Sequence, residues 1–271
     1  MTDNKRVRLE VLSRKPKKSN GKPPLLFIHG AFAGAWCWDA HFLPWFAEKG
    51  YEVHALSLSG HNGSRDNEGE LHMLGIADYV EDVVEVVNSL DQPPILIGHS
   101  MGGLVAQKYL EGRKAAGAVL MASVPPTGLT GPVMSMSINQ PWLAWQIGMF
   151  EAFGMRQTSV NLLHDALFSA DMDPKDTMKY LPHVQQESMR ATSEMYFAGL
   201  PIPALMNSVP TLVVGGGADK LIDQVHVIAT GIFFGVQAEI FGGVGHGMML
   251  DVKWEDVASH IHDWVEKNEF S

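Results

Sequence analysis

The sequence predicts an α/β fold: a doubly wound, mostly parallel sheet with an inserted helical cap. Short apolar runs alternate with longer amphipathic stretches, as expected for repeated strand and helix units. This alternation stops after Met121 and resumes at Val209, and the residues between have a helical period. A chain of 271 residues, 46% of them hydrophobic, is long enough for one such domain with an insertion.

Seven apolar runs are expected to be strands. Several are hydrophobic throughout, which is typical of parallel strands that helices cover on both faces. The expected strands are Val7–Leu12, Leu25–Ile28, Glu52–Leu56, Ile95–Ile97, Gly117–Met121, Thr211–Val214 and Ala238–Phe241. Right-handed crossovers would place the helices between them, and these are expected at Trp38–Lys49, Gly75–Leu90, Gly103–Glu111, Gln224–Gly231 and Val252–Asn268.

The stretch between the fifth and sixth expected strands is predicted to be a cap of about four helices. We place this cap segment at residues 124–208, with the core domain at 1–123 and 209–271. Its helical stretches are WLAWQIGMFEAF, SVNLLHDALF, DTMKYL and QQESMRATSEMYF. The segment is rich in Met, a flexible side chain that suits either the cap's own core or a wall that adapts to apolar ligands. Both alternatives stay open.

Charge and composition exclude several classes of protein. The formal net charge is -10, and eight of the 20 Lys and Arg residues lie in residues 1–22, where RKPKKSNGKPP is typical of a solvated loop. An acidic body argues against nucleic-acid binding. Cys37 is the only cysteine, which excludes an internal disulfide and a CxxC site. We expect no metal and no cofactor.

The sequence contains no secretory signal and no long uncharged apolar run. We therefore expect a cytoplasmic protein with no membrane insertion. The oligomeric state does not follow from the sequence.

The stretch Gly98-His99-Ser100-Met101-Gly102 matches the motif GxSxG between an expected strand and an expected helix. This is the context of a nucleophile elbow, in which a sharp turn exposes the serine. Such a turn strains the serine backbone and leaves room only for small residues two positions before and after it. A glycine-rich loop with a capping serine is the alternative if the motif is taken alone.

Two turns carry candidate backbone donors for an oxyanion: the Ser100 turn itself and the turn at one other strand end. Met101 follows Ser100, and the loop after His29-Gly30 offers the N–H of either Ala31 or Phe32. Two convergent N–H groups would stabilise the charge that acyl transfer places on a carbonyl oxygen. A tight turn with a core histidine is the alternative for this loop.

The last two strand ends supply a carboxylate and an imidazole. Asp219 follows VGGGA, and His246 lies in the glycine-rich loop GVGHG, where its ring is free to project. A serine needs a base, and the base needs an orienting group, to become a nucleophile. Asp251 is close to His246 and is an alternative orienting acid, but it is expected on the closing helix.

The motifs HGAFAG, GHSMGG, GGGADK and GVGHG, in this order and spacing, resemble the α/β-hydrolase superfamily. The resemblance extends from Pro23 to Val265. It implies the α/β-hydrolase fold and the order Ser, Asp, His along the chain. By this resemblance Ser100 is the nucleophile, His246 the base and Asp219 the orienting acid.

The resemblance and the composition together predict a carboxylic ester hydrolase that forms an acyl-enzyme. We expect an ester of a small to medium lipophilic substrate in a pocket under the cap, with five side chains contacting it: Phe32, His99, Trp142, Trp145 and Phe150. Ser at position 100 disfavours relatives with Asp or Cys there, and Gly247 replaces the Lys of hydroxynitrile lyases. The GHNGS turn at residues 60–64 is expected to be structural.

Several alternative functions remain on the same scaffold. The triad could cleave a C–C bond, a thioester or a lactone, or act as a cofactor-free perhydrolase. A ligand receptor derived from a hydrolase is the alternative that is not an enzyme.

Overall fold

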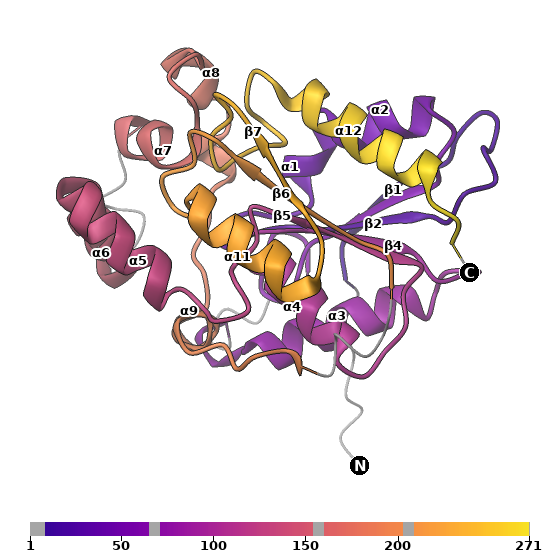
Figure 1. The fold of residues 1–271 in the computed structure, drawn as a ribbon, viewed down its shortest axis with the longest axis horizontal. Coiled ribbons are helices and arrows are strands. Elements are labelled where there is room, and N and C mark those ends of the chain that lie inside the picture. The colour runs from indigo at the N-terminus through magenta and orange to yellow at the C-terminus, as the bar shows by residue number, and fades with distance from the viewer. Residues whose placement is uncertain (1–8, 65–70, 154–159, 203–208, 271) are drawn as a thin grey trace.

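The computed structural model describes residues 9–64, 71–153, 160–202 and 209–270. These residues form a seven-stranded sheet in the order β1-β3-β2-β4-β5-β6-β7 (Figure 1). β1 is antiparallel to β3, and the other neighbouring strands are parallel. The doubly wound, mostly parallel sheet is therefore confirmed. The strands are β1 (Val11–Arg14), β2 (Leu25–Ile28), β3 (Val53–Leu56), β4 (Ile95–His99), β5 (Gly117–Met121), β6 (Thr211–Gly216) and β7 (Ala238–Phe241).

Helices cover the sheet on both faces, and each face has its own apolar core. Side chains alternate across a strand, so Leu25 and Phe27 of β2 join one core while Leu26 and Ile28 join the other. The first face carries α1 (Trp36–Asp39), α2 (Phe42–Glu48) and α12 (Trp254–Lys267). The second carries α3 (Ile76–Val87), α4 (Met101–Leu110) and α11 (Gln224–Phe234), as Figure 1 shows.

The helix expected at Trp38–Lys49 is instead two helices, α1 and α2. His41, between them, has non-helical backbone angles of φ -139° and ψ -52°. Pro44 explains the break, because proline lacks an N–H and its ring clashes with the carbonyl four residues earlier. That carbonyl belongs to Ala40, where the first helix ends.

The first strand begins later than expected, at Val11, and extends to Arg14. Its position follows from its antiparallel register with β3, which pairs Val11 with Leu56 and Arg14 with Val53. Residues 7 and 8 lie outside the described residues. Helix α4 begins two residues earlier than expected, so its N-terminus directly follows Ser100.

The cap segment is helical, as its periodicity indicated, and connects β5 to β6. Its standing as a separate domain stays a prediction. In Figure 1 the helices α5 to α8 lie together at one end of the sheet. Within the described residues the segment contains α5 (Thr130–Asn139), α6 (Pro141–Phe153), α7 (Val160–Leu167), α8 (Pro174–Thr177), a 3₁₀ turn at Leu181–His183 and α9 (Met189–Tyr196). A second 3₁₀ turn, Leu71–Met73, precedes α3.

Among the described residues, none of the helices combines the length and the apolar character that crossing a bilayer requires. The cytoplasmic location and the lack of nucleic-acid binding stay predictions.

Candidate active site

Ser100 lies at the turn between β4 and α4 in a strained backbone conformation. Its φ of 51° and ψ of -116° fall in a region that side-chain-bearing residues rarely adopt. Hydrogen bonds hold this turn, because the Ser100 N–H donates to the Met121 carbonyl at 3.0 Å and the Ser100 carbonyl accepts from Val124 N–H at 3.0 Å. The N-terminus of α4 follows at once and favours negative charge beside the hydroxyl.

The glycines on either side of Ser100 are required by space. A Cβ at Gly98 would lie 2.3 Å from the Gly102 carbonyl oxygen, and one at Gly102 would lie 2.3 Å from the Ile28 carbonyl oxygen. Both contacts are with backbone, which cannot move aside. The steric reason expected for the two glycines is confirmed.

His246 and Asp219 meet at the carboxyl end of the sheet. The His246 Nδ1 lies 2.8 Å from Asp219 Oδ2, and both residues are buried. Asp219 Oδ1 accepts from the N–H groups of Leu221 and Ile222 at 2.8 and 2.9 Å. Because an ionised carboxylate only accepts, the His246 proton resides on Nδ1 and the lone pair on Nε2.

His99 connects the serine turn to the histidine loop. Its Nε2–H donates to the His246 carbonyl at 2.9 Å, and the two ring centroids are 4.8 Å apart. Burial lowers the pKa of His99 well below its ordinary value, and the neighbouring His246 lowers it further. The ring is therefore a neutral donor that fixes the position of the His246 backbone.

The loop after β2 approaches Ser100 closely. A Cβ at Gly30 would lie 3.0 Å from the Ser100 Cβ, so the glycine permits this approach. Phe32 has a positive φ of 64°, and its N–H donates to Glu187 Oε2 over a long 3.4 Å. Ala31 and Phe32, the two candidate oxyanion donors on this loop, thus differ in one respect: the N–H of Phe32 is directed at a carboxylate of the cap segment.

An apolar cavity of about 270 Å³ surrounds Ser100 and His246. The core contributes Ala31, Phe32, Trp36 and His99 to its wall, and the cap segment covers it with α5, α6 and the end of α7. The cap side chains in the wall include Val133, Met136, Ala144, Ile147, Leu167 and Phe168. Such a cavity accepts an apolar group of modest size.

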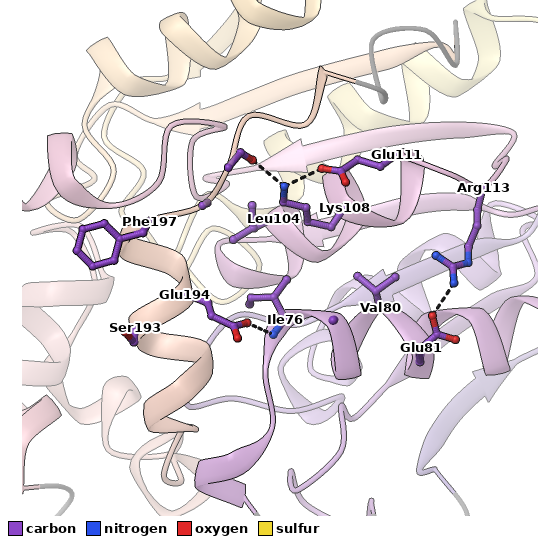
Figure 2. Close-up of a pocket in the computed structure, with 13 residues that line it drawn as sticks. Ile76, Val80, Glu81, Leu104, Lys108, Glu111, Arg113, Ser193, Glu194 and Phe197 are labelled. Carbon is purple, nitrogen blue, oxygen red and sulfur yellow. Dashed lines mark hydrogen bonds and ion pairs between the residues drawn. The ribbon is translucent and has the colours of Figure 1, made fainter.

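A separate groove of about 550 Å³ lies between α3, α4 and α9 (Figure 2). Its charged groups are paired: Lys108 with Glu111 at 2.7 Å, and Arg113 with Glu81. None of the described residues that line it belongs to the predicted site. The groove is therefore distinct from the cavity at Ser100.

Comparison with known proteins identifies the family. Residues 25–260 match the model of the Alpha/beta hydrolase family. The chain belongs to this family. This hydrolase is 25% identical over 269 residues to Phospholipase YtpA of Bacillus subtilis, with 90% of each chain covered. It is 29% identical over 178 residues to Methylesterase 4 of Arabidopsis thaliana, covering 61% of this chain and 64% of that protein.

The fold of this hydrolase is also that of solved esterase structures. An esterase from Exiguobacterium antarcticum superimposes with a TM-score of 0.76 over 96% of each chain, at 16% sequence identity. At that identity the likeness shows the shared fold alone.

Not all predicted site residues of this hydrolase gather at the cavity. Phe32, His99, Ser100 and His246 line it, whereas Trp142 and Trp145 do not. The two indole rings stack on each other 4.9 Å apart at the outer surface and are 66% and 54% exposed. The expectation that these tryptophans contact substrate therefore differs from the structure, because the cavity-facing side of α6 is formed by Ala144 and Ile147. The side chain of Phe150 lies outside the described residues.

Two buried carboxylates beside the site have contacts that the sequence did not predict. Glu187 lies just before α9, in a stretch distinguished in the sequence only by its helical period. The described hydrogen bonds of Asp251 do not go to the His246 ring; Asp251 accepts from the Gly245 N–H at 2.9 Å and from Ser169 of the cap segment. The sequence alone does not separate Glu187 from the many exposed acids, and it distinguishes Asp251 only by its nearness to His246 along the chain.

Proposed function

We propose that this protein is a serine hydrolase that cleaves carboxylic esters of small to medium lipophilic substrates through an acyl-enzyme. One observation carries the proposal: Ser100, on a strained turn, lines the same cavity as His246, and His246 forms a hydrogen bond with Asp219. The phospholipase, methylesterase and esterase names of its relatives support ester hydrolysis at the general level.

In the proposed reaction Ser100 attacks the ester carbonyl while His246 Nε2 takes the hydroxyl proton. Asp219 holds the imidazole in the tautomer that leaves Nε2 able to accept. His246 then returns the proton to the leaving alcohol, and water repeats the sequence on the acyl-enzyme. Each step moves one proton and needs no external oxidant or reductant.

The tetrahedral oxyanion is assigned to two backbone N–H groups, those of Met101 and Ala31. Met101 begins α4 directly after the nucleophile. Ala31 is preferred to Phe32, because the Phe32 N–H is already directed at Glu187. Two preorganised donors of this kind are among the largest contributions to acyl transfer.

The apolar cavity wall supports a lipophilic acyl or alcohol group. Full burial of each methylene contributes about 0.8 kcal/mol to binding, and the cavity of about 270 Å³ accommodates a short chain. The flexible Met136 in the wall allows chains of different shape.

Ser100→Ala tests this proposal. Turnover of p-nitrophenyl butyrate should fall by several powers of ten, on the order of 10⁶ for a triad that acts as a unit, and labelling by a fluorophosphonate probe should vanish. Ser123→Ala is a matched control, because Ser123 is a buried serine outside the described cavity lining. If Ser100→Ala kept more than a tenth of wild-type turnover, the assignment would be wrong.

A further inference from the structure

A buried carboxylate that the proposed reaction does not use lies behind the loop after β2. Glu187, 5% exposed, belongs to the cap segment. Its Oε1 accepts from the Tyr79 hydroxyl and from Ser188 N–H, each at 2.7 Å. Its Oε2 lies 3.0 Å from His61 Nε2 and 3.4 Å from Phe32 N. A carboxylate so buried is stable only with several donors and a positive partner.

His61 is that positive partner. Its Nε2 faces the Glu187 carboxylate, and its Nδ1 faces the Ser59 carbonyl at 3.1 Å. Both neighbours are acceptors, so both ring nitrogens must carry protons and the ring is an imidazolium. Burial acts to lower the pKa of His61, but the charge of Glu187 and its hydrogen bond raise that pKa above its ordinary value. The histidine of the GHNGS turn thus belongs to a buried ion pair.

The pair is connected to the proposed oxyanion loop through Phe32. The N–H of Phe32 donates to Glu187, and its carbonyl accepts from the N–H of Gln185 at 3.0 Å. Glu187 and Gln185 of the cap segment therefore form hydrogen bonds with the N–H and the carbonyl of Phe32, a residue of the core. Phe32 has a φ of 64°, a strained value that persists only where the surroundings impose it. The N–H preceding it is that of Ala31, the donor proposed for the oxyanion.

The ion pair of His61 and Glu187 also balances the charge near the proposed oxyanion. An unbalanced carboxylate one residue from an oxyanion donor would oppose the negative charge that develops in the transition state. The positive charge of His61 cancels it at 3.0 Å. His29, whose ring centroid is 4.9 Å from that of His61, stays neutral and adds no charge, because burial and the nearby His61 lower its pKa to about 3.

We propose that Glu187, paired with His61, is a positioning residue: it fixes the Phe32 peptide so that the adjacent Ala31 N–H faces the oxyanion. This inference rests on the proposed ester hydrolysis. It also gives the cap segment a part in the chemistry, since a residue of the cap sets the geometry of a donor on the core.

Glu187→Gln tests the inference. The amide removes the negative charge and turns an N–H toward groups that donate, so the Phe32 peptide loses its anchor. For p-nitrophenyl butyrate we expect kcat to fall by roughly 10- to 100-fold with KM within about threefold, because the lost contact acts only in the transition state. Glu194→Gln is the matched control. Glu194 also joins the cap segment to the core, through the Ile76 N–H at 2.8 Å, but its described hydrogen bonds go to Ile76 and Arg190 and not to the loop after β2.

A pair of inhibitors separates positioning from a general loss of structure. An alkyl trifluoromethyl ketone forms an oxyanion on the serine, whereas the matching methyl ketone chiefly fills the cavity. Glu187→Gln should weaken the trifluoromethyl ketone by about tenfold or more and the methyl ketone by less than twofold. Equal weakening of both inhibitors would mean a merely structural role and would overturn the inference.

Tyr79→Phe keeps the test decisive if Glu187→Gln does not fold. It removes one hydrogen bond to Glu187 and leaves the charge pair intact. We expect a fall in kcat of roughly two- to fivefold at unchanged KM, and an unchanged kcat would overturn the inference. Failure of the parent proposal looks different: the wild-type protein would then neither hydrolyse the ester nor react with a fluorophosphonate. A wild type that does both, with Glu187→Gln matching Glu194→Gln, would contradict the positioning role alone.

Discussion

Asp251 and Ser169 are joined by two hydrogen bonds of 2.8 Å, from the Ser169 N–H to Oδ2 and from its hydroxyl to Oδ1. The same carboxylate accepts from the N–H groups of Gly245 and Val252 at 2.9 and 2.7 Å. Asp251 is fully buried, so these four donors replace its hydration. One carboxylate thus joins the cap segment to the loop that carries His246.

Asp251→Ala is expected to destabilise the fold. Several buried donors lose their acceptor at once, which should cost about 3 kcal/mol or more and lower Tm by roughly 6–12 °C. Thermal unfolding followed by circular dichroism measures the change. Ser169→Ala should cost about 1–2 kcal/mol, because it removes one of the four bonds. A Tm for Asp251→Ala within 2 °C of wild type would contradict the anchoring role.

Asp219→Asn should abolish most activity while the fold persists. The amide oxygen can still accept from the Leu221 and Ile222 N–H groups, but the amide N–H then faces His246 Nδ1. That arrangement imposes the tautomer whose Nε2 carries the proton, and this nitrogen cannot act as a base. We expect kcat to fall by about 10⁴-fold with Tm nearly unchanged.

A matched control for this substitution is Asp223→Asn, at the N-cap of α11. It changes a carboxylate to an amide without contact to His246, so kcat should stay within about twofold of wild type. Equal losses in both variants would indicate a general effect of charge and would remove Asp219 from the site.

Ala144→Phe should shorten the chain that the cavity accepts. Ala144 lies in the cavity wall, and loss of room for two methylene groups would cost about 1.6 kcal/mol, roughly 15-fold in kcat/KM. The ratio of kcat/KM for p-nitrophenyl octanoate to that for the acetate measures this effect. Trp145→Ala, at the outer face of the same helix, should leave the ratio within twofold. An unchanged ratio in Ala144→Phe would place the acyl chain elsewhere.

Acid should destabilise the protein through His29. Its Nδ1–H donates to the Gly30 carbonyl at 2.8 Å and its Nε2 accepts from the Leu58 N–H at 3.0 Å, so the folded state admits only the neutral ring. Burial and the nearby His61 lower its pKa to about 3. Between pH 3 and the unfolded value of about 6.5 the unfolded chain binds more protons, and stability falls as pH falls.

Urea unfolding at two pH values measures this contribution. From pH 7 to pH 4.5 the His29 ring should remove about 2–3 kcal/mol of stability from the wild type. The free energy of unfolding of His29→Gln should fall by that much less over the same interval. His72→Gln, at an exposed histidine, should behave like the wild type. The same acid sensitivity in His29→Gln and the wild type would show that His29 is not the cause.

Local sequence patterns were sufficient to predict the sheet and the turns. Continuous apolar runs require burial on both faces, which determines a parallel sheet with helices on either side. The GxSxG motif predicted a tight turn at Ser100, because only glycine fits at positions 98 and 102. The break at His41 also had a local cause in Pro44, although the helical period around it concealed the break.

The tertiary structure decided which distant residues meet. No local pattern distinguishes Glu187 from Glu194, yet one is buried against His61 and Phe32 while the other is bonded to the start of α3. Helical periodicity likewise could not predict which side of α6 faces the cavity. In the folded protein Ala144 and Ile147 face it, whereas Trp142 and Trp145 stack on each other outside it. Periodicity describes a helix about its own axis. Only the contacts between elements determine which of its sides is covered, and therefore which side chains reach the substrate.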